Sequence, residues 1–260
     1  MANNPAPRLR TVSKSLAPFP LNSFPKELPL ILGREIVYLL TTKGIAVLEG
    51  PEWERIFTLC IKADWKPSNV GLDDVVLGNT AWGAKTVKAT SPATVKKIRL
   101  ISGRNAPSFS YGNDVSIKHD PSIVGEQILE IWNARVSSIR EKYQHLRTIV
   151  LVKSNDLSEV AVFEHDTIRY DPELFNWKWI SNTRGSTNLM GYTNRDNSQI
   201  FTWQPSGGQF TIHEEIKVPR LVINIRKPPI LDKELVLKGI GFSTDWISYR
   251  VIQQQPPATL

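Results

Sequence analysis

The hydrophobic residues of this chain alternate between helical and strand spacing, and that alternation restricts the possible folds more than any other feature. Residues 49–62 carry a proline and acids near their start and a lysine at their end, which favours an amphipathic helix. Its apolar residues recur at helical spacing: Trp53, Ile56, Phe57 and Cys60. Val75–Leu77 then predicts a short buried strand, Gly78-Asn79 a turn, and Thr80–Ala89 a partner strand. A helix followed by a hairpin therefore opens the core.

A longer helix is expected after this hairpin. Asp120 can cap it and Pro121 can occupy its first turn. One apolar stripe follows at helical spacing: Val124, Ile128, Ile131, Trp132, Val136, Ile139, Tyr143 and Leu146. Strands are expected before and after it, at residues 96–102, 148–153 and 160–164. Because helices alternate with strands, the pattern predicts an α/β core.

The two ends of the chain differ from this core. Residues 1–30 contain a polar, proline-rich stretch that predicts an extended arm, and Gly33–Leu48 fits either a helix or a strand. From Asp171 onward the pattern is strand and turn, with strands expected at residues 199–203, 209–213 and 220–225. We therefore predict an arm over residues 1–30, an α/β core over 31–170, and a β-rich part over 171–260 that packs on the same domain.

Composition limits the classes of function. Lys and Arg number 32 against 25 Asp and Glu, a net charge of +7 that is compatible with a polyanionic partner. Cys60 is the single cysteine, which excludes an intrachain disulfide and a zinc site built from thiolates. The four histidines are scattered, without the spacing of a zinc motif. The sequence offers neither an apolar run long enough for a membrane nor the apolar stretch of a signal peptide, so we expect a cytoplasmic protein.

The predicted hairpin carries a pattern of charges suited to phosphodiester hydrolysis. Asp74 stands immediately before its first strand, and Lys85 lies partway along the second. An acid and a lysine placed in this way can converge at one end of a sheet. Glu54, on the preceding helix, can bring another carboxylate to the same end. Carboxylates bind Mg²⁺, and a lysine can assist the attacking water or the scissile phosphate.

These residues resemble the PD-(D/E)xK nuclease superfamily, especially type II restriction endonucleases. The resemblance lies in Trp53-Glu54, Asp73-Asp74-Val75-Val76-Leu77 and Trp82-Gly83-Ala84-Lys85-Thr86-Val87-Lys88. It implies a restriction-endonuclease-like mixed central sheet flanked by helices. By residue, it implies that Asp74 binds metal, with Asp73 as the alternative, that Lys85 serves the nucleophile, and that Glu54 matches the acid on the preceding helix. It also implies Mg²⁺ as cofactor, double-stranded DNA as substrate with 5′-phosphate products, a homodimer, and a prokaryotic source.

The chain departs from the family pattern at one position. The triplet reads Gly83-Ala84-Lys85, so the acid that normally binds metal is missing from it. Either Glu54, Glu49 or Asp73 is expected to supply the second carboxylate, or one metal is held more weakly. The rival interpretations are a non-catalytic DNA-binding module with a degenerate site, and a repair or recombination nuclease without sequence specificity.

Basic residues after the hairpin are candidates for DNA contacts. Lys96, Lys97 and Arg99 form a cluster in which Lys97 and Arg99 share one strand face, although a solvated strand face has the same pattern. In Gly103-Arg104-Asn105, arginine and asparagine are suited to guanine and adenine edges. The alternative for Arg104 is an ion pair with an acid such as Asp114. Residues 107–113 are expected to form a loop.

Overall fold

A computed structural model describes residues 15–66, 71–112, 114–181, 183 and 185–250. Five α-helices occur within these residues: α1 (Leu28–Lys43), α2 (Gly50–Ile61), α3 (Pro107–Tyr111), α4 (Pro121–Arg140) and α5 (Lys233–Gly239). Short 3₁₀ turns occupy Pro172–Leu174, Pro205–Gly207 and Thr244–Trp246. In the same part of the chain, no helix is both long enough and apolar enough to cross a membrane.

The first sheet, sheet A, is mixed. Its described strands run in the order β1 (Asp64–Trp65), β2 (Val75–Leu77), β3 (Thr80–Lys88), β5 (His145–Lys153), β6 (Glu159–Asp166) and β11 (Leu221–Asn224). Here β3 and β5 pair in parallel, whereas the other neighbouring strands pair antiparallel. A parallel pair needs a crossover connection, and α4 lies in the segment that joins β3 to β5.

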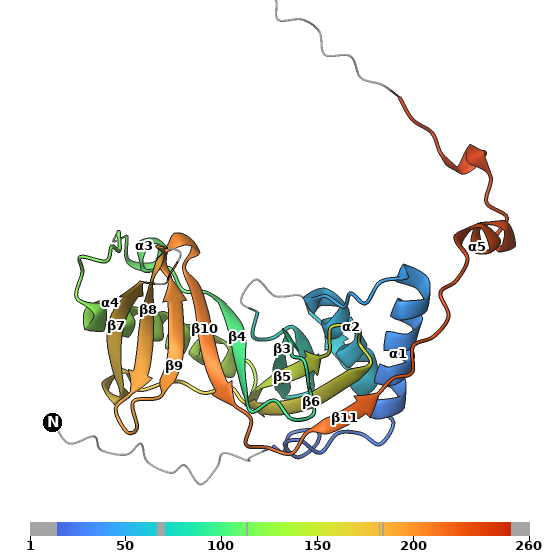
Figure 1. Ribbon diagram of the computed structural model, residues 1–260. Helices are drawn as coiled ribbons and strands as arrows, with labels where there is room; N and C mark the ends of the chain where they lie inside the picture. Colours follow the sequence, from blue (N-terminus) through green and yellow to red (C-terminus); the bar gives the residue numbers. More distant parts are fainter. Residues whose placement is uncertain (1–14, 67–70, 113, 182, 184, 251–260) are drawn as a thin grey trace, which may run out of the picture.

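The second sheet, sheet B, is antiparallel throughout its described strands. Their order is β4 (Lys97–Arg104), β10 (Gln209–Glu215), β9 (Gln199–Gln204), β8 (Thr187–Thr193) and β7 (Phe175–Ser181). Figure 1 shows the two sheets side by side, with α4 behind sheet B and with α1 and α2 beside sheet A. The protein is therefore a mixed α/β protein in which helices flank both sheets.

Three groups of buried side chains hold these layers together. The first group joins α1 and α2 to one face of sheet A, and includes Trp53, Phe57 and Trp82. The second joins α4 to sheet B and to the hairpin, and includes Trp132 and Phe210. The third joins β4 to β5 and β6, so a strand of sheet B packs across sheet A. Strands from the second half of the chain enter both sheets: β7 to β10 form one sheet with β4, and β11 returns to sheet A.

The predicted hairpin and first helix agree closely with the structure. Helix α2 begins with a capping box between Glu49 and Glu52, with proline in its first turn. The hairpin forms by β2 and β3 around Gly78-Asn79, with Val75 opposite Trp82. Its strand pattern is decided locally, because the apolar run is short and the turn residues follow it at once.

Other predictions need correction. The long helix ends at Arg140, so Tyr143 lies beyond it and Leu146 belongs to β5. Leu146 nevertheless packs in the same apolar group as the helix stripe, because the chain turns back beside the helix. Residues 107–111 form the one-turn helix α3 where a loop was expected.

The predicted arm is also shorter than expected. Helix α1 starts at Leu28, and Phe19 and Phe24 pack against the first core group. Residues 1–14 of the arm lie outside the described residues. The polar, proline-rich character of this stretch suggested an extended arm, whereas its two phenylalanines pack against the core.

The contact between α4 and β7 depends on a glycine. A Cβ at Gly125 would lie 2.3 Å from the indole carbons of Trp177, so only glycine allows the helix to approach this strand. Trp177 is itself buried and stacks on Phe201.

Gly125→Ala should therefore destabilise the protein by about 1–3 kcal/mol, because the added methyl overpacks the contact. This loss should exceed the intrinsic helix preference of alanine over glycine, which is about 1 kcal/mol. Urea unfolding measures the effect, with Glu126→Ala at the neighbouring exposed position as control. An alanine variant at least as stable as the wild type would contradict this account of the packing.

Candidate active site

Asp74 lies buried at the start of the hairpin, where the sequence predicted the first acid. It immediately precedes β2, and only 4% of its surface is exposed. Its Oδ2 accepts a hydrogen bond from the backbone N–H of Ala84 on β3, at 3.1 Å. The pairing of the two strands thus fixes the position of this carboxylate.

The charges of the other predicted site residues shift the pKa of Asp74. Burial raises the pKa of Asp74 to about 6, while Lys85 and the Ala84 N–H oppose this rise. The carboxylates of Glu54 and Asp73 add to the rise. A carboxyl group with such a pKa titrates close to neutral pH, and groups of this kind are concentrated at functional sites. The structure therefore gathers Asp74, Lys85, Glu54 and Asp73 at one end of sheet A.

Lys85 points into the space between the two sheets, where it lies among residues of both. Its Nζ donates a hydrogen bond to the carbonyl oxygen of Gly71 at 3.1 Å. Burial lowers the pKa of Lys85, and the charge of Asp74 opposes that decrease. Among the ion pairs of the described residues, none joins Lys85 to Asp74 within 4.0 Å. Lys85 is thus held by a neutral backbone group beside an acid with which it is not directly paired.

The packing around Gly83 accounts for the missing acid of the triplet. A Cβ at this position would lie 3.1 Å from the carbonyl oxygen of Gly71 and 3.2 Å from the Cα of Leu72. The backbone of residues 71–72 therefore occupies the space into which a longer side chain would extend. With this backbone in place, Gly83 cannot be replaced by Asp or Glu without moving the segment that holds Lys85.

The two nearest acids differ in their surroundings. The Oε2 of Glu54 accepts a hydrogen bond from Trp65 Nε1 at 3.1 Å, and the Arg55 guanidinium lies over the same indole ring. The Oδ1 of Asp73 is buried and has no hydrogen-bond partner among the described residues. Burying an unpaired carboxylate oxygen costs free energy unless a ligand satisfies it. Of the two acids, Asp73 is therefore the one with an oxygen that no described residue uses.

Glu49 has another role. Its side chain belongs to the capping box at the start of α2, and its backbone N–H donates in return to the Glu52 carboxylate. It is thus engaged in holding the helix end, which leaves Glu54 and Asp73 as the candidates to replace the triplet acid.

The candidates for DNA contacts divide into exposed and buried residues. Lys96, Lys97, Arg99 and Arg104 are exposed, and Lys97 donates to the backbone oxygen of Gln199. Lys97 and Arg99 lie on the outer face of β4, because Ile98 and Leu100 between them face the core. No ion pair between Arg104 and Asp114 is found among the described residues.

Asn105 does not lie where a base-reading residue must be. It is fully buried; its side-chain amide donates to the backbone oxygen of Ile128, and its Oδ1 accepts from Arg135. Its backbone oxygen accepts a hydrogen bond from Trp203 Nε1 at 2.6 Å. Asn105 therefore ties α4 to sheet B, and its buried side chain is not available for the predicted base contact.

Sequence reasoning missed Arg135, which lies on α4 near Lys85. Its guanidinium donates to the backbone oxygen of Ser102 at 2.8 Å, and its charge lowers the pKa of Lys85. A single arginine on a helix gives no pattern by which the sequence could identify it. Only the crossover of α4 behind the sheets brings it to this site.

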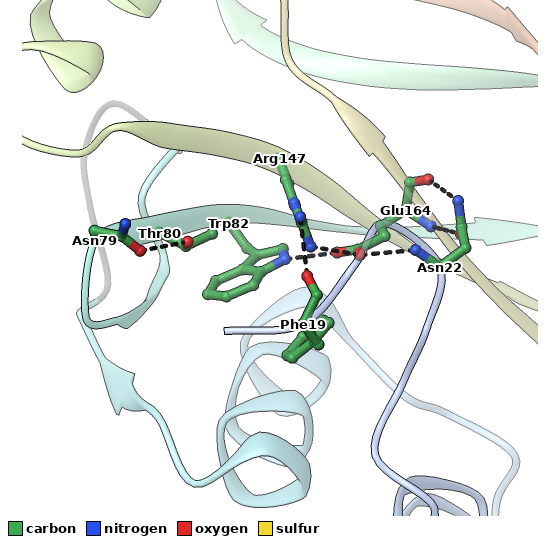
Figure 2. A network of polar contacts seen from close by, with 7 residues as sticks. All are labelled: Phe19, Asn22, Asn79, Thr80, Trp82, Arg147 and Glu164. Atoms are coloured by element: carbon green, nitrogen blue, oxygen red, sulfur yellow. Dashed lines mark hydrogen bonds and ion pairs between the residues drawn. The ribbon is translucent and has the colours of Figure 1, made fainter. Parts of the chain in front are cut away.

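A second buried charge cluster lies on the opposite face of β3. Glu164 accepts hydrogen bonds from Trp82 Nε1 at 2.7 Å and from Arg147 at 2.8 Å (Figure 2). Asn22 binds both its carboxylate and its backbone (Figure 2). Because every described partner is internal, this cluster serves the structure and holds β3 against its neighbours.

Asp74 gives a direct test of these electrostatics. Since its pKa is higher in the folded protein than the usual 3.8, folding with an ionised Asp74 costs free energy. This cost is absent below the unfolded pKa and is complete above about 6. Asp74→Asn removes the charge and keeps an acceptor for the Ala84 N–H. It should raise the unfolding free energy by up to about 3 kcal/mol at pH 8 and have little effect near pH 4.

Urea unfolding at the two pH values, in the presence of a chelator, measures this difference. Glu141→Gln, at an exposed position after α4, is the control and should leave the pH dependence unchanged. If the Asp74→Asn variant gained no stability at pH 8, the carboxylate would not be destabilised by burial.

A scan against protein-family models and searches of curated proteins and of solved structures give no match to this chain.

Proposed function

We propose that this protein is a Mg²⁺-dependent endonuclease acting on double-stranded DNA, with a restriction-endonuclease-like core. The observation that carries the proposal is the meeting of Asp74 and Lys85 at the end of the β2–β3 hairpin. Burial removes both groups from water in large part, and it shifts the pKa of each toward the neutral range. A structural ion pair would join such groups directly, whereas here each is held by a backbone group of its own.

The acids near Asp74 could supply some of the ligands of one hard cation, but not a complete set. No group of three or more His, Cys, Asp or Glu side chains suited to a metal is found among the described residues. Mg²⁺, however, is commonly bound by one or two carboxylates and completes its shell with waters and substrate phosphate oxygens. Asp74 would hold it with Asp73, whose buried oxygen has no partner in the described part of the chain, or with Glu54. A bound Mg²⁺ would supply charge to polarise the phosphate and to ease deprotonation of a water.

The chain's own groups have separate parts in this proposal. Asp74 must be ionised, so its raised pKa makes the site sensitive to pH near 6. Lys85 would orient the attacking water or neutralise the phosphate, and its lowered pKa makes loss of its proton easier than for an exposed lysine. The hydrogen bond from Lys85 Nζ to the Gly71 carbonyl oxygen would hold the ammonium group in place before substrate binds.

A basic surface supports DNA as the substrate. The outer face of β4 presents Lys97 and Arg99, and the strand ends at the exposed Arg104. The net charge of +7 favours association with a polyanion. Because β4 also packs across sheet A beside β5, this basic strand belongs to the same body as the acid–lysine site.

Cleavage assays with site variants test the activity. In plasmid and phage DNA digests with Mg²⁺, Asp74→Asn and Lys85→Met should each lower the cleavage rate by at least about 100-fold, because each removes a group that acts on the reacting atoms. Lys88→Met, at the exposed end of the same strand, should retain wild-type activity. Below pH 6 the wild-type rate should fall as Asp74 becomes protonated.

The products distinguish the rival functions. Discrete fragments that require Mg²⁺ and Lys85 support a site-specific endonuclease, and a smear supports a nuclease without sequence specificity. Salt-sensitive binding without cleavage under any divalent metal would overturn the proposed activity and favour a binding module.

The basic strand makes a separate prediction for binding. Arg99→Ala should weaken DNA binding on every sequence and reduce the slope of log K against log salt by about 1, as expected for the loss of one phosphate contact. Fluorescence anisotropy at several salt concentrations measures this slope. Lys142→Ala, an exposed change beyond α4, is the matched control. Equal slopes for wild type and Arg99→Ala would show that β4 does not face the phosphates.

A further inference from the structure

The C-terminal segment from Leu231 to Tyr249 lies apart from the body of the protein (Figure 1). It is here called the arm, and it is distinct from the predicted N-terminal arm over residues 1–30. It contains α5, which is capped by the Asp232 side chain, and the 3₁₀ turn at Thr244–Trp246. Its large apolar side chains are exposed, at 69% for Leu235, 61% for Trp246 and 63% for Ile247. A seven-residue helix is not stable by itself in water, so its order depends on apolar contacts that another surface must supply.

The described hydrogen bonds tie the arm to its own body only at its first residue, Leu231. Beyond Leu231, its described hydrogen bonds all lie within the arm. The N–H of Leu231 donates to the Thr41 oxygen at the end of α1, and the cap of α5 follows at the very next residue, Asp232. Pro228 and Pro229 stiffen the chain just before this point. From this anchor the arm leads away from the body that carries it (Figure 1).

The body offers an apolar groove that fits such a segment. This groove, between α1 and α2, has a volume of about 600 Å³, and its apolar lining includes Tyr38, Leu39, Leu59 and Trp65. Leu59 is 53% exposed and Tyr38 62%, so the groove is open. Its lining carries both acids and bases, Glu35 and Glu52 with Arg55 and Lys62, and α5 carries Lys233 and Lys238 with Glu234. The two surfaces are thus apolar at their centres, and each carries charges of both signs beside that centre.

We propose that the arm of one copy docks in the α1–α2 groove of a second copy, and that the two copies exchange arms. Each chain carries one arm and one groove, and its own arm is directed away. A reciprocal exchange satisfies both in a closed, two-fold symmetric dimer. The proposal does not depend on nuclease activity. It also differs from an interface built on the apolar stripe of α4, because that stripe is buried against sheet B.

Sedimentation of the full-length protein at micromolar concentration should show a dimer. The arm variant Leu235→Ser/Trp246→Ser/Ile247→Ser and the groove variant Leu59→Ser should each raise the dimer dissociation constant by at least about 30-fold, as expected for the loss of interface anchors. Ile123→Ser, which changes an equally exposed residue on α4, should leave it unchanged. Urea unfolding of the monomeric variants checks that their bodies remain folded.

Mixing the two variants identifies the occupant of the groove. An arm variant and a groove variant together still possess one intact arm and one intact groove, so they should form a heterodimer more tightly than either forms a homodimer. A monomeric wild type would overturn the proposal. A wild-type dimer unaffected by either variant, or a mixture that gains nothing, would also overturn it, since the interface would then lie elsewhere or the arm would bind its own groove.

Discussion

The buried carboxylate of Glu164 is the interaction on which the arrangement of sheet A depends most. It is fully buried on β6 and receives hydrogen bonds from Trp82 on β3, Arg147 on β5 and Asn22 of the N-terminal segment. A charge removed from water in this way is tolerated only when donors surround it. Three neighbouring strands and the N-terminal segment are therefore joined at one point, and Phe19 completes the cluster by stacking on Trp82.

The position of β3 links this cluster to the candidate active site. Side chains alternate along a strand, so Trp82 faces the Glu164 cluster while Lys85 faces the space between the sheets. On the first face, the Glu164 carboxylate receives its hydrogen bonds from within the protein. The second face places a partly desolvated lysine near an acid whose pKa is raised to about 6. The strand β3 thus carries the stabilising Glu164 cluster on one face and the destabilising pair of Lys85 and Asp74 beside its other face.

The sequence predicted local structure well where local chemistry is decisive. The capping box and amphipathic spacing of α2, and the turn of the β2–β3 hairpin, involve residues close together in the chain. It failed where distant residues decide. The segment around Phe19 is ordered by contacts with β3 and β5, and residues 107–111 form a helix that composition suggested as a loop. The end of α4 was misplaced because Leu146 continues its apolar pattern from a strand.

By itself, the sequence determined an α/β chain in which an acid and a lysine lie on a hairpin after a helix bearing a second acid. Only the tertiary structure decided which of those residues are available. It buried Asn105 between α4 and sheet B, engaged Glu49 in a helix cap, and filled the space beside Gly83 with the backbone of residues 71–72. The reason is physical: spacing along a chain sets which face a side chain occupies, but burial, desolvation and hydrogen-bond partners come from segments that the spacing does not specify.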